Sequence, residues 1–292
     1  LQSAVGLNPV RDMWGIRPTT VSYTRQPHGC PVYGRCTQSL PACAGHAPEL
    51  TAQPDGRLLA CNRGGVLTLL ECRGLCKAFG RQRVLDGIDL TLYSGEIVSL
   101  VGRSGAGKTT VFNLLTKVYQ PTRGTVLLDG VDTHNMNTVQ VNKAGIARTF
   151  QNIRLFNNLS VEDNVKIGMH NSIHCGLFSG ILRLPRYWKE EKTAHERALE
   201  LLSIFDMQDL AGVKAGSLPY GAQRRLEIVR ALGTNPSLLL LDEPAAGMNP
   251  SETAELMENI VKIRDTFQIA IMLIEHDMSL VMGICEGICV LN

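Results

Sequence analysis

One stretch constrains the fold of this chain more than any other: residues 102–109 read Gly-Arg-Ser-Gly-Ala-Gly-Lys-Thr. The stretch fits the pattern G-x-x-x-x-G-K-[ST], a loop whose backbone N–H groups turn inward around phosphate oxygens. An apolar run at residues 97–101 precedes the loop, and a helix-forming stretch at residues 110–118 follows it. A phosphate-binding loop between a strand and a helix predicts an α/β fold that binds a nucleotide.

The residue types of this loop each have a predicted role. Glycines are needed because a Cβ would obstruct several of the backbone conformations that surround a phosphate. Lys108 is expected to reach the β- and γ-phosphates, and Thr109 is expected to hold Mg²⁺ through its hydroxyl. The predicted nucleotide contacts are Gly102, Arg103, Ser104, Gly105, Ala106, Gly107, Lys108, Thr109 and Thr110.

A carboxylate pair follows a second apolar run. Residues 238–241 are leucines, and Asp242 and Glu243 come directly after them. Ligands of open α/β sheets bind at the carboxyl ends of strands, so Asp242 is expected to take Mg²⁺ through water. Glu243 is expected to polarise the attacking water as a general base. A capped strand end followed by a turn is the alternative, which the phosphate loop disfavours.

Three further candidates depend more on context. His276 follows the apolar run 269–274 and is expected to hydrogen-bond a γ-phosphate, with a purely structural histidine as the alternative. Gln151 is expected to coordinate Mg²⁺ or to position water, unless it is simply a polar loop residue. Phe79 lies upstream of the phosphate loop, where it either stacks on adenine or fills the core.

The wider pattern favours an α/β domain from residue 67 onward. Strand-like runs alternate with helical stretches, which is typical of a largely parallel sheet. Asp129-Gly130 predicts a tight turn in an antiparallel piece, and residues 189–206 predict an amphipathic helix. The net charge of +2 argues against a nucleic-acid partner, and no apolar run approaches the roughly 18 residues that span a bilayer.

Together these residues resemble an ATP-binding cassette (ABC) ATPase over residues 67–292. Residues 102–109 resemble its Walker A motif and residues 238–242 its Walker B motif. Gln151 matches the Q-loop, His276 the switch histidine, Phe79 the adenine-stacking aromatic, and residues 246–249 the D-loop. Residues 218–222 read Leu-Pro-Tyr-Gly-Ala where the family carries its Leu-Ser-Gly-Gly-Gln signature, so Pro219 replaces Ser and Ala222 replaces Gln.

The resemblance implies a P-loop NTPase cassette with a RecA-like core, an antiparallel β subdomain and a helical subdomain at about residues 152–235. It also implies that two cassettes sandwich two ATP molecules and that the amide of Gly221 approaches the γ-phosphate in trans. The expected partners are a second ABC ATPase subunit or domain, membrane permease subunits and, indirectly, a substrate-binding protein. The expected location is the cytoplasmic face of the cell membrane.

A closer resemblance is to the ATPase subunits of branched-chain amino-acid importers. It is carried by residues 145–156, 176–180, 218–228 and 242–250. The resemblance implies that ATP hydrolysis energises import of branched-chain or other amino acids or of short peptides. The alternative is a soluble ABC ATPase acting on ribosomes or DNA, although neither a charged linker nor heptad repeats are present. A P-loop kinase or GTPase lacks support because the signature region and His276 favour a cassette.

Composition changes near residue 62. Seven of the 13 prolines and four of the nine cysteines lie in residues 1–62, which predicts a loop-rich module. Thiolates at Cys30, Cys36, Cys43 and Cys61 are compatible with a [4Fe–4S] cluster or with zinc, and the wide spacing favours the cluster. Free thiols in a loose loop are the remaining alternative.

This stretch resembles the C-terminal tail of oligopeptide and dipeptide importer ATPases, in which these cysteines are associated with an iron–sulfur cluster. The matching positions are residues 3–5, 29–31, 35–36, 43, 49–50 and 60–61. Such a tail normally follows a cassette, whereas here it precedes one. Since the chain begins at Leu1 and stops at Asn292, where the family continues through another β segment, we expect a C-terminally truncated fragment of a tandem protein.

Overall fold

A computed structural model of the chain describes residues 50–52, 58–60, 68–172 and 185–291. The chain divides into two compact units, Leu1–Thr68 and Leu69–Asn292, and each is described by itself. In the first unit, β1 (Leu50–Ala52) pairs with β2 (Leu58–Ala60) in an antiparallel hairpin. The four cysteines predicted to hold a cluster, Cys30, Cys36, Cys43 and Cys61, lie outside the described residues, so their role stays a prediction.

An antiparallel sheet opens the second unit. Its strand order is β4-β3-β6-β7. The bounds are β3 (Thr68–Phe79), β4 (Gln82–Tyr93), β6 (Arg123–Leu128) and β7 (Val131–Asp132). Asp129 and Gly130 join β6 to β7 with positive φ angles of 48° and 75°, the conformation that a two-residue hairpin turn requires. The turn predicted from the sequence is therefore confirmed.

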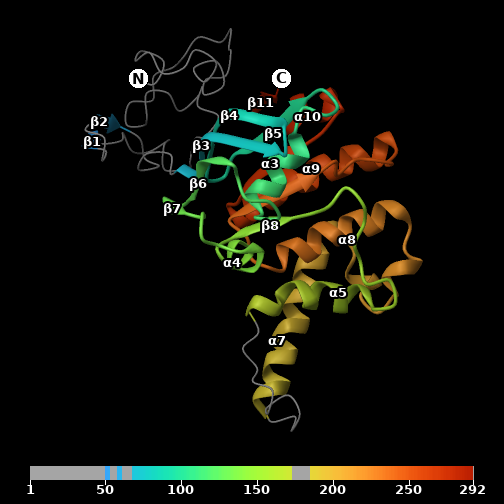
Figure 1. Cartoon of the computed structure of the whole chain (residues 1–292). Coiled ribbons are helices and arrows are strands. Elements are labelled where there is room, and N and C mark those ends of the chain that lie inside the picture. The colour runs from blue at the N-terminus through green and yellow to red at the C-terminus, as the bar shows by residue number, and fades with distance from the viewer. Residues whose placement is uncertain (1–49, 53–57, 61–67, 173–184, 292) are drawn as a thin grey trace, which may run out of the picture. The chain divides into compact units, whose positions relative to one another are not determined.

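A five-stranded parallel sheet forms the centre of this unit (Figure 1), with strand order β11-β5-β10-β9-β8. The bounds are β5 (Ile97–Gly102), β8 (Ile146–Arg148), β9 (Leu238–Asp242), β10 (Ala270–Ile274) and β11 (Gly287–Leu291). Within this sheet Ile274 lies opposite Asp242, so the carboxyl ends of β9 and β10 meet. The register therefore brings together the two strand ends at which the sequence predicts functional residues, Asp242 and Glu243 at β9 and His276 after β10.

Both faces of the parallel sheet are buried. Leu239 and Leu241 belong to one apolar cluster, which includes the helical region, while Leu238 and Leu240 belong to the other, which includes the antiparallel sheet. Successive residues of a strand point to opposite faces, which explains why β9 is an unbroken run of leucines. The predicted largely parallel α/β core is confirmed.

Helices cover both faces and form a separate helical region, which extends below β8 in Figure 1. Two of the helices, α9 (Pro250–Phe267) and α10 (Met278–Ile284), alternate with the last strands. The helices are α3 (Lys108–Leu115), α4 (Thr138–Lys143), α5 (Val161–Gly168), α7 (Pro185–Leu202), α8 (Tyr220–Leu232), α9 (Pro250–Phe267) and α10 (Met278–Ile284). Short 3₁₀ turns occupy Met169–Ser172, Ser203–Phe205, Gln208–Leu210 and Ala215–Ser217.

Two helices differ in their bounds from the prediction. The helix after the phosphate loop begins at Lys108 rather than at residue 110 and ends at Leu115, because Lys117 takes a left-handed backbone with φ 57°. The amphipathic helix predicted at residues 189–206 is α7, which ends at Leu202, and Asp206 beyond it has φ 53°.

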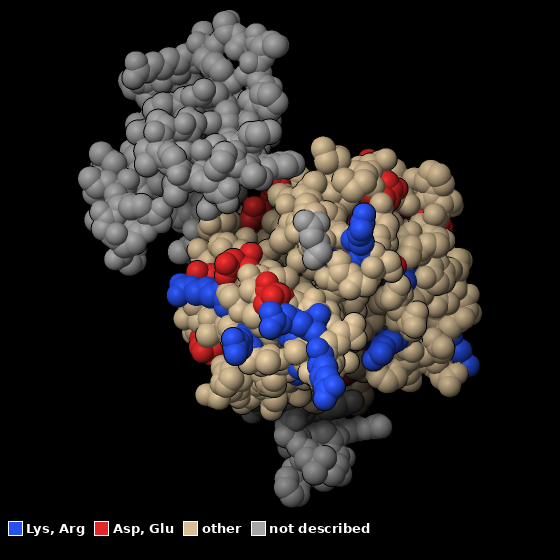
Figure 2. Space-filling model, turned by 45° about the horizontal axis from the view of Figure 1, so that its top comes forward, with Lys and Arg blue, Asp and Glu red and all other residues tan. Residues whose placement is uncertain are grey.

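The surface agrees with the small net charge. Most of the face shown in Figure 2 carries neither Lys or Arg nor Asp or Glu, and the charged side chains of both signs are scattered over it, with several of opposite sign near one another on its left. Among the residues that the structure describes, no helix is long and apolar enough to cross a membrane.

Candidate functional site

The phosphate loop joins the end of β5 to the start of α3. Gly105 and Gly107 have φ angles of 81° and 92°, which residues with a Cβ rarely adopt, and a Cβ on Gly107 would lie 2.6 Å from Leu85. Lys108 is buried, and its Nζ donates to the carbonyl oxygens of Gly102 at 2.8 Å and Arg103 at 3.0 Å. The ammonium group is thus held inside the loop at the N-terminus of a helix, where anions bind.

Three neighbouring strands carry the predicted catalytic residues. Gln151 follows β8, Glu243 follows β9 and His276 follows β10, and these strands are adjacent in the sheet. Gln151 Nε2 donates to Glu243 Oε2 at 3.0 Å, and His276 Nε2 lies 2.9 Å from Glu243 Oε1. Both oxygens of the Glu243 carboxylate are therefore oriented by side chains that the sequence had marked separately.

The backbone of Glu243 is unusual. Its φ angle is 49°, a left-handed conformation that costs energy for a residue with a side chain. Its N–H donates to the carbonyl oxygen of Ile274 at 3.0 Å, which ties the end of β9 to the end of β10. Such local strain is common at functional sites, because the surrounding structure over-determines the position of the side chain.

Asp242 is buried and paired. Arg148 Nη2 lies 2.8 Å from Asp242 Oδ2, with only 6% and 3% of the two side chains exposed. Arg148 Nη1 also donates to Asn113 Oδ1 on α3 at 2.7 Å. A buried carboxylate needs such a partner because an isolated buried charge is costly.

The magnesium ligands predicted from the sequence form a suitable donor set. Thr109 offers a hydroxyl, Gln151 an amide oxygen and Asp242 a carboxylate, and oxygen donors of these kinds are what Mg²⁺ prefers alongside water and phosphate. Thr109 and Gln151 are both exposed, while Asp242 uses one oxygen, Oδ2, in its pair with Arg148. These residues would hold Mg²⁺ with the nucleotide, and the ion would neutralise charge on the β- and γ-phosphates.

Phe79 is exposed at the end of β3, with 43% of its surface accessible. The alternative that Phe79 fills the core is therefore wrong. Its ring packs edge-to-face on Tyr119 at 5.2 Å between centroids, and Lys77 Nζ lies 4.9 Å from the Phe79 ring. An exposed aromatic face of this kind can stack on a base, so adenine stacking stays a prediction.

The signature region begins α8. Pro219 is the N-cap of this helix, so the helix lacks the side-chain cap that a serine would supply. Gly221 approaches α9 closely, because a Cβ there would lie 2.9 Å from Glu252 Oε1. Gly247 in the D-loop approaches the ring of Tyr220, where a Cβ would come within 3.0 Å. The signature and D-loop segments therefore pack on each other within one cassette.

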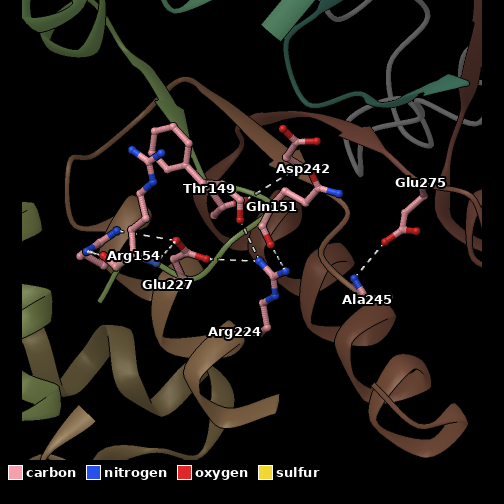
Figure 3. Close-up of polar contacts among 10 residues, drawn as sticks. Thr149, Gln151, Arg154, Arg224, Glu227, Asp242, Ala245 and Glu275 are labelled. Carbon is pink, nitrogen blue, oxygen red and sulfur yellow. Dashed lines mark hydrogen bonds and ion pairs between the residues drawn. The ribbon is translucent and has the colours of Figure 1, made fainter. Parts of the chain in front are cut away.

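A buried carboxylate that the sequence analysis missed lies beside the switch histidine. Glu275 Oε1 accepts from the N–H of Ala245 at 2.9 Å (Figure 3), and Glu275 Oε2 accepts from the N–H of His276 at 3.1 Å. Burial raises the pKa of Glu275, and the nearby Glu243 raises it further, while these N–H groups oppose the rise. Glu275 therefore joins the backbone at His276 to the backbone at Ala245, which directly precedes the D-loop.

Other missed residues carry charge inside the fold. Arg148, Arg224 and Glu227 are all at least nine-tenths buried at their side chains. One signal was present: Arg224, Glu227 and Arg230 recur at every third residue between the apolar residues of the helix, which places them on one helix face. A charged face on a buried helix indicates polar partners, although the sequence does not say which.

Comparisons with known proteins agree with this geometry. A family model described as ABC transporter matches residues 85–246. LivG of Escherichia coli K12, a high-affinity branched-chain amino acid transport ATP-binding protein, is 46% identical over 224 residues, which cover 77% of this chain and 88% of LivG. BraF of Pseudomonas aeruginosa, described in the same words, is 41% identical over the same shares of each chain.

Solved structures show the same fold. A nucleotide-free ATP-binding cassette from an ABC transporter superposes with a TM-score of 0.66 and 27% identity, covering 77% of this chain and 87% of that one. A dimeric cassette in a post-hydrolysis state, bound to ADP and Pi, gives a TM-score of 0.65 at 25% identity, covering 77% and 94%. The family match, the identity to these relatives and the geometry of the phosphate loop and Glu243 agree. The chain belongs to the ABC transporter family and is an ATP-hydrolysing cassette.

Proposed function

We propose that this chain is the ATP-hydrolysing subunit of an importer for branched-chain or other amino acids. The observation that carries the proposal is its 46% identity to LivG over most of both chains. The site supports it, because the residues that hold and cleave ATP in the proposal lie together at adjacent strand ends. Short peptides are the alternative cargo.

The proposed reaction uses the chain's own residues in sequence. Lys108 and the backbone of the phosphate loop bind the phosphates, and Phe79 stacks on the base. Glu243 accepts a proton from the attacking water while Gln151 and His276 hold its two oxygens in place. Bound Mg²⁺ supplies charge neutralisation at the phosphates.

The proposed partners complete a site that one cassette leaves open. A second cassette would present the N-terminus of its α8, including Gly221, to the γ-phosphate across the dimer. Permease subunits would receive the movement at the cytoplasmic face of the membrane, and a substrate-binding protein would deliver the solute to them.

Two experiments test this proposal. The natural full-length protein, tagged and purified from detergent-solubilised membranes, should bring down permease subunits and a second cassette. After reconstitution with those partners and their binding protein, leucine should stimulate ATP hydrolysis more than a dipeptide does. Stimulation by the dipeptide alone would favour peptide import. Recovery only from the soluble fraction, bound to ribosomes or DNA, would contradict the importer.

A further inference from the structure

Three charged side chains of α8 face the segment that follows β8. Arg224, Glu227 and Arg230 recur at every third position, and Arg224 and Glu227 are only 3% and 1% exposed. Burying charged groups in a helix that packs on the core is costly unless they have well-placed partners. Their partners are the backbone groups of residues 150–154, called here the Q-loop segment (Figure 3).

Arg224 holds the start of the Q-loop segment. Its Nη1 donates to the carbonyl oxygen of Phe150 at 2.8 Å, and its Nη2 donates to the carbonyl oxygen of Gln151. The planar guanidinium fork therefore spans two consecutive carbonyls, a geometry that a single ammonium group does not reproduce. Glu227 Oε2 lies 3.5 Å from Arg224 Nη1 and supplies the opposite charge.

Glu227 and Arg230 hold the other end of the segment. The N–H of Arg154 donates to Glu227 Oε1 at 3.1 Å, and Arg230 Nη1 donates to the carbonyl oxygen of Arg154. Burial raises the pKa of Glu227, although the Arg154 N–H and the two arginines lower it in part. The backbone at both ends of the Q-loop segment is thus attached to one helix.

The same segment contacts the catalytic base. The carbonyl oxygen of Gln151 accepts from Arg224, while its side chain donates to Glu243 Oε2 at 3.0 Å. One residue therefore joins α8 to the general base, with its backbone held on one side and its carboxamide engaged on the other. A displacement of α8 relative to the parallel sheet would move Gln151 away from Glu243.

We propose that Arg224 and Glu227 are positioning residues that set Gln151 against Glu243 and thereby make hydrolysis depend on the position of α8. Because α8 begins with the signature residues, a contact made there in trans would reach the base through Arg224 and Gln151. The inference rests on ATP hydrolysis by the cassette and is independent of which solute is transported.

A double-mutant cycle on the full chain tests this role. Arg224→Met should lower kcat about tenfold, because small misplacements of catalytic groups are costly in rate. Affinity for ATP should change less than about twofold, since the phosphate loop remains intact. In a Gln151→Ala background the same substitution should lower kcat by less than about twofold, because its effect passes through Gln151.

Arg225→Met is the matched control. Arg225 is the next residue of α8, but its guanidinium pairs with Glu255 on α9 rather than with the backbone of the Q-loop segment. This variant should keep kcat within about twofold of the wild type. If Arg224→Met does not fold, Glu227→Gln serves in the same cycle, because it removes the countercharge without changing side-chain size.

The outcomes separate the inference from the proposed function. Losses that multiply in the double variant, or an equal loss in Arg225→Met, would refute the positioning role of Arg224. A fall in thermal stability that accounts for the lost activity would also refute it, because a merely structural residue behaves in that way. A wild-type protein that hydrolyses no ATP would instead refute the proposed function, and the positioning role with it.

Discussion

At the scale of single residues, the arrangement around Glu243 shows what a sequence can and cannot predict. The second of the two acidic residues after four leucines, Glu243, was predicted as a base at a strand end, and the structure places it directly after β9. The sequence did not predict that Gln151 and His276 would each hold one of its oxygens. Those contacts depend on the order of β8, β9 and β10 in the sheet, which local patterns do not encode.

The ammonium group of Lys108 gives the first prediction at this scale. Lys108→Ala removes the cation that the loop holds by two carbonyl oxygens at the helix N-terminus. A hydrogen bond to a charged group contributes about 1.5–3 kcal/mol, so affinity for ATP should fall roughly ten- to a hundredfold. Titration of the wild type and of Lys108→Ala with a fluorescent ATP analogue measures this loss of affinity.

A second lysine provides the control for that measurement. Lys262 is exposed on α9, so Lys262→Ala removes the same charge without touching the phosphate loop. This variant should bind the analogue as the wild type does. Equal affinities for the wild type and Lys108→Ala would contradict the assignment of residues 102–109 as the phosphate site.

At the scale of elements, the three central strands of the parallel sheet, β5, β10 and β9, were predicted more closely than the helix ends. The run 238–241 became β9 with one added residue, because its leucines alternate between two apolar clusters. Helix ends were less predictable, since they depend on single left-handed residues such as Lys117 and Asp206. β4, β8 and β11 were not predicted as strands. The residues of β11, Gly287–Leu291, are mostly apolar, but periodicity does not distinguish so short an apolar run from part of a buried helix.

Arg148 joins three elements and yields a prediction about stability. From the end of β8 it pairs with Asp242 of β9 and donates to Asn113 of α3. Removing one partner of a buried ion pair typically costs about 3–5 kcal/mol, because the other charge is left uncompensated. Arg148→Met should therefore lower the free energy of unfolding by roughly that amount, as measured by urea denaturation without nucleotide.

Two variants show whether the ion pair is the cause. Arg148→Met with Asp242→Asn removes both charges, and part of the lost stability should return. Arg83→Met breaks an ion pair with Asp86 in which both side chains are about two-thirds exposed, so it should change stability little. Similar losses in Arg148→Met and Arg83→Met would show that the buried pair has no special role.

At the scale of the whole molecule, the sequence predicted both the fold of this cassette and a contact with a second cassette, and a single chain can show only the fold. The cassette was predicted from motifs, and a family match over residues 85–246 confirms it. The trans contact of Gly221 stays a prediction, because it needs a second cassette. Pro219 stands where the family has serine, so the N-cap of α8 lacks that hydroxyl, and Ala222 replaces the family's glutamine. Both replacements lie in the segment that would make the trans contact.

Association of two cassettes gives the last prediction. Glu243→Gln keeps a side chain of the same size between Gln151 and His276 but can no longer accept a proton. ATP should then persist at the site and hold two chains together, because each nucleotide would bridge the phosphate loop of one chain and α8 of the other. With ATP and Mg²⁺, light scattering should report twice the mass of one chain, and without nucleotide a single chain. Adding Lys108→Ala should abolish the dimer; a dimer that persists without nucleotide would mean that something other than bound ATP joins the chains.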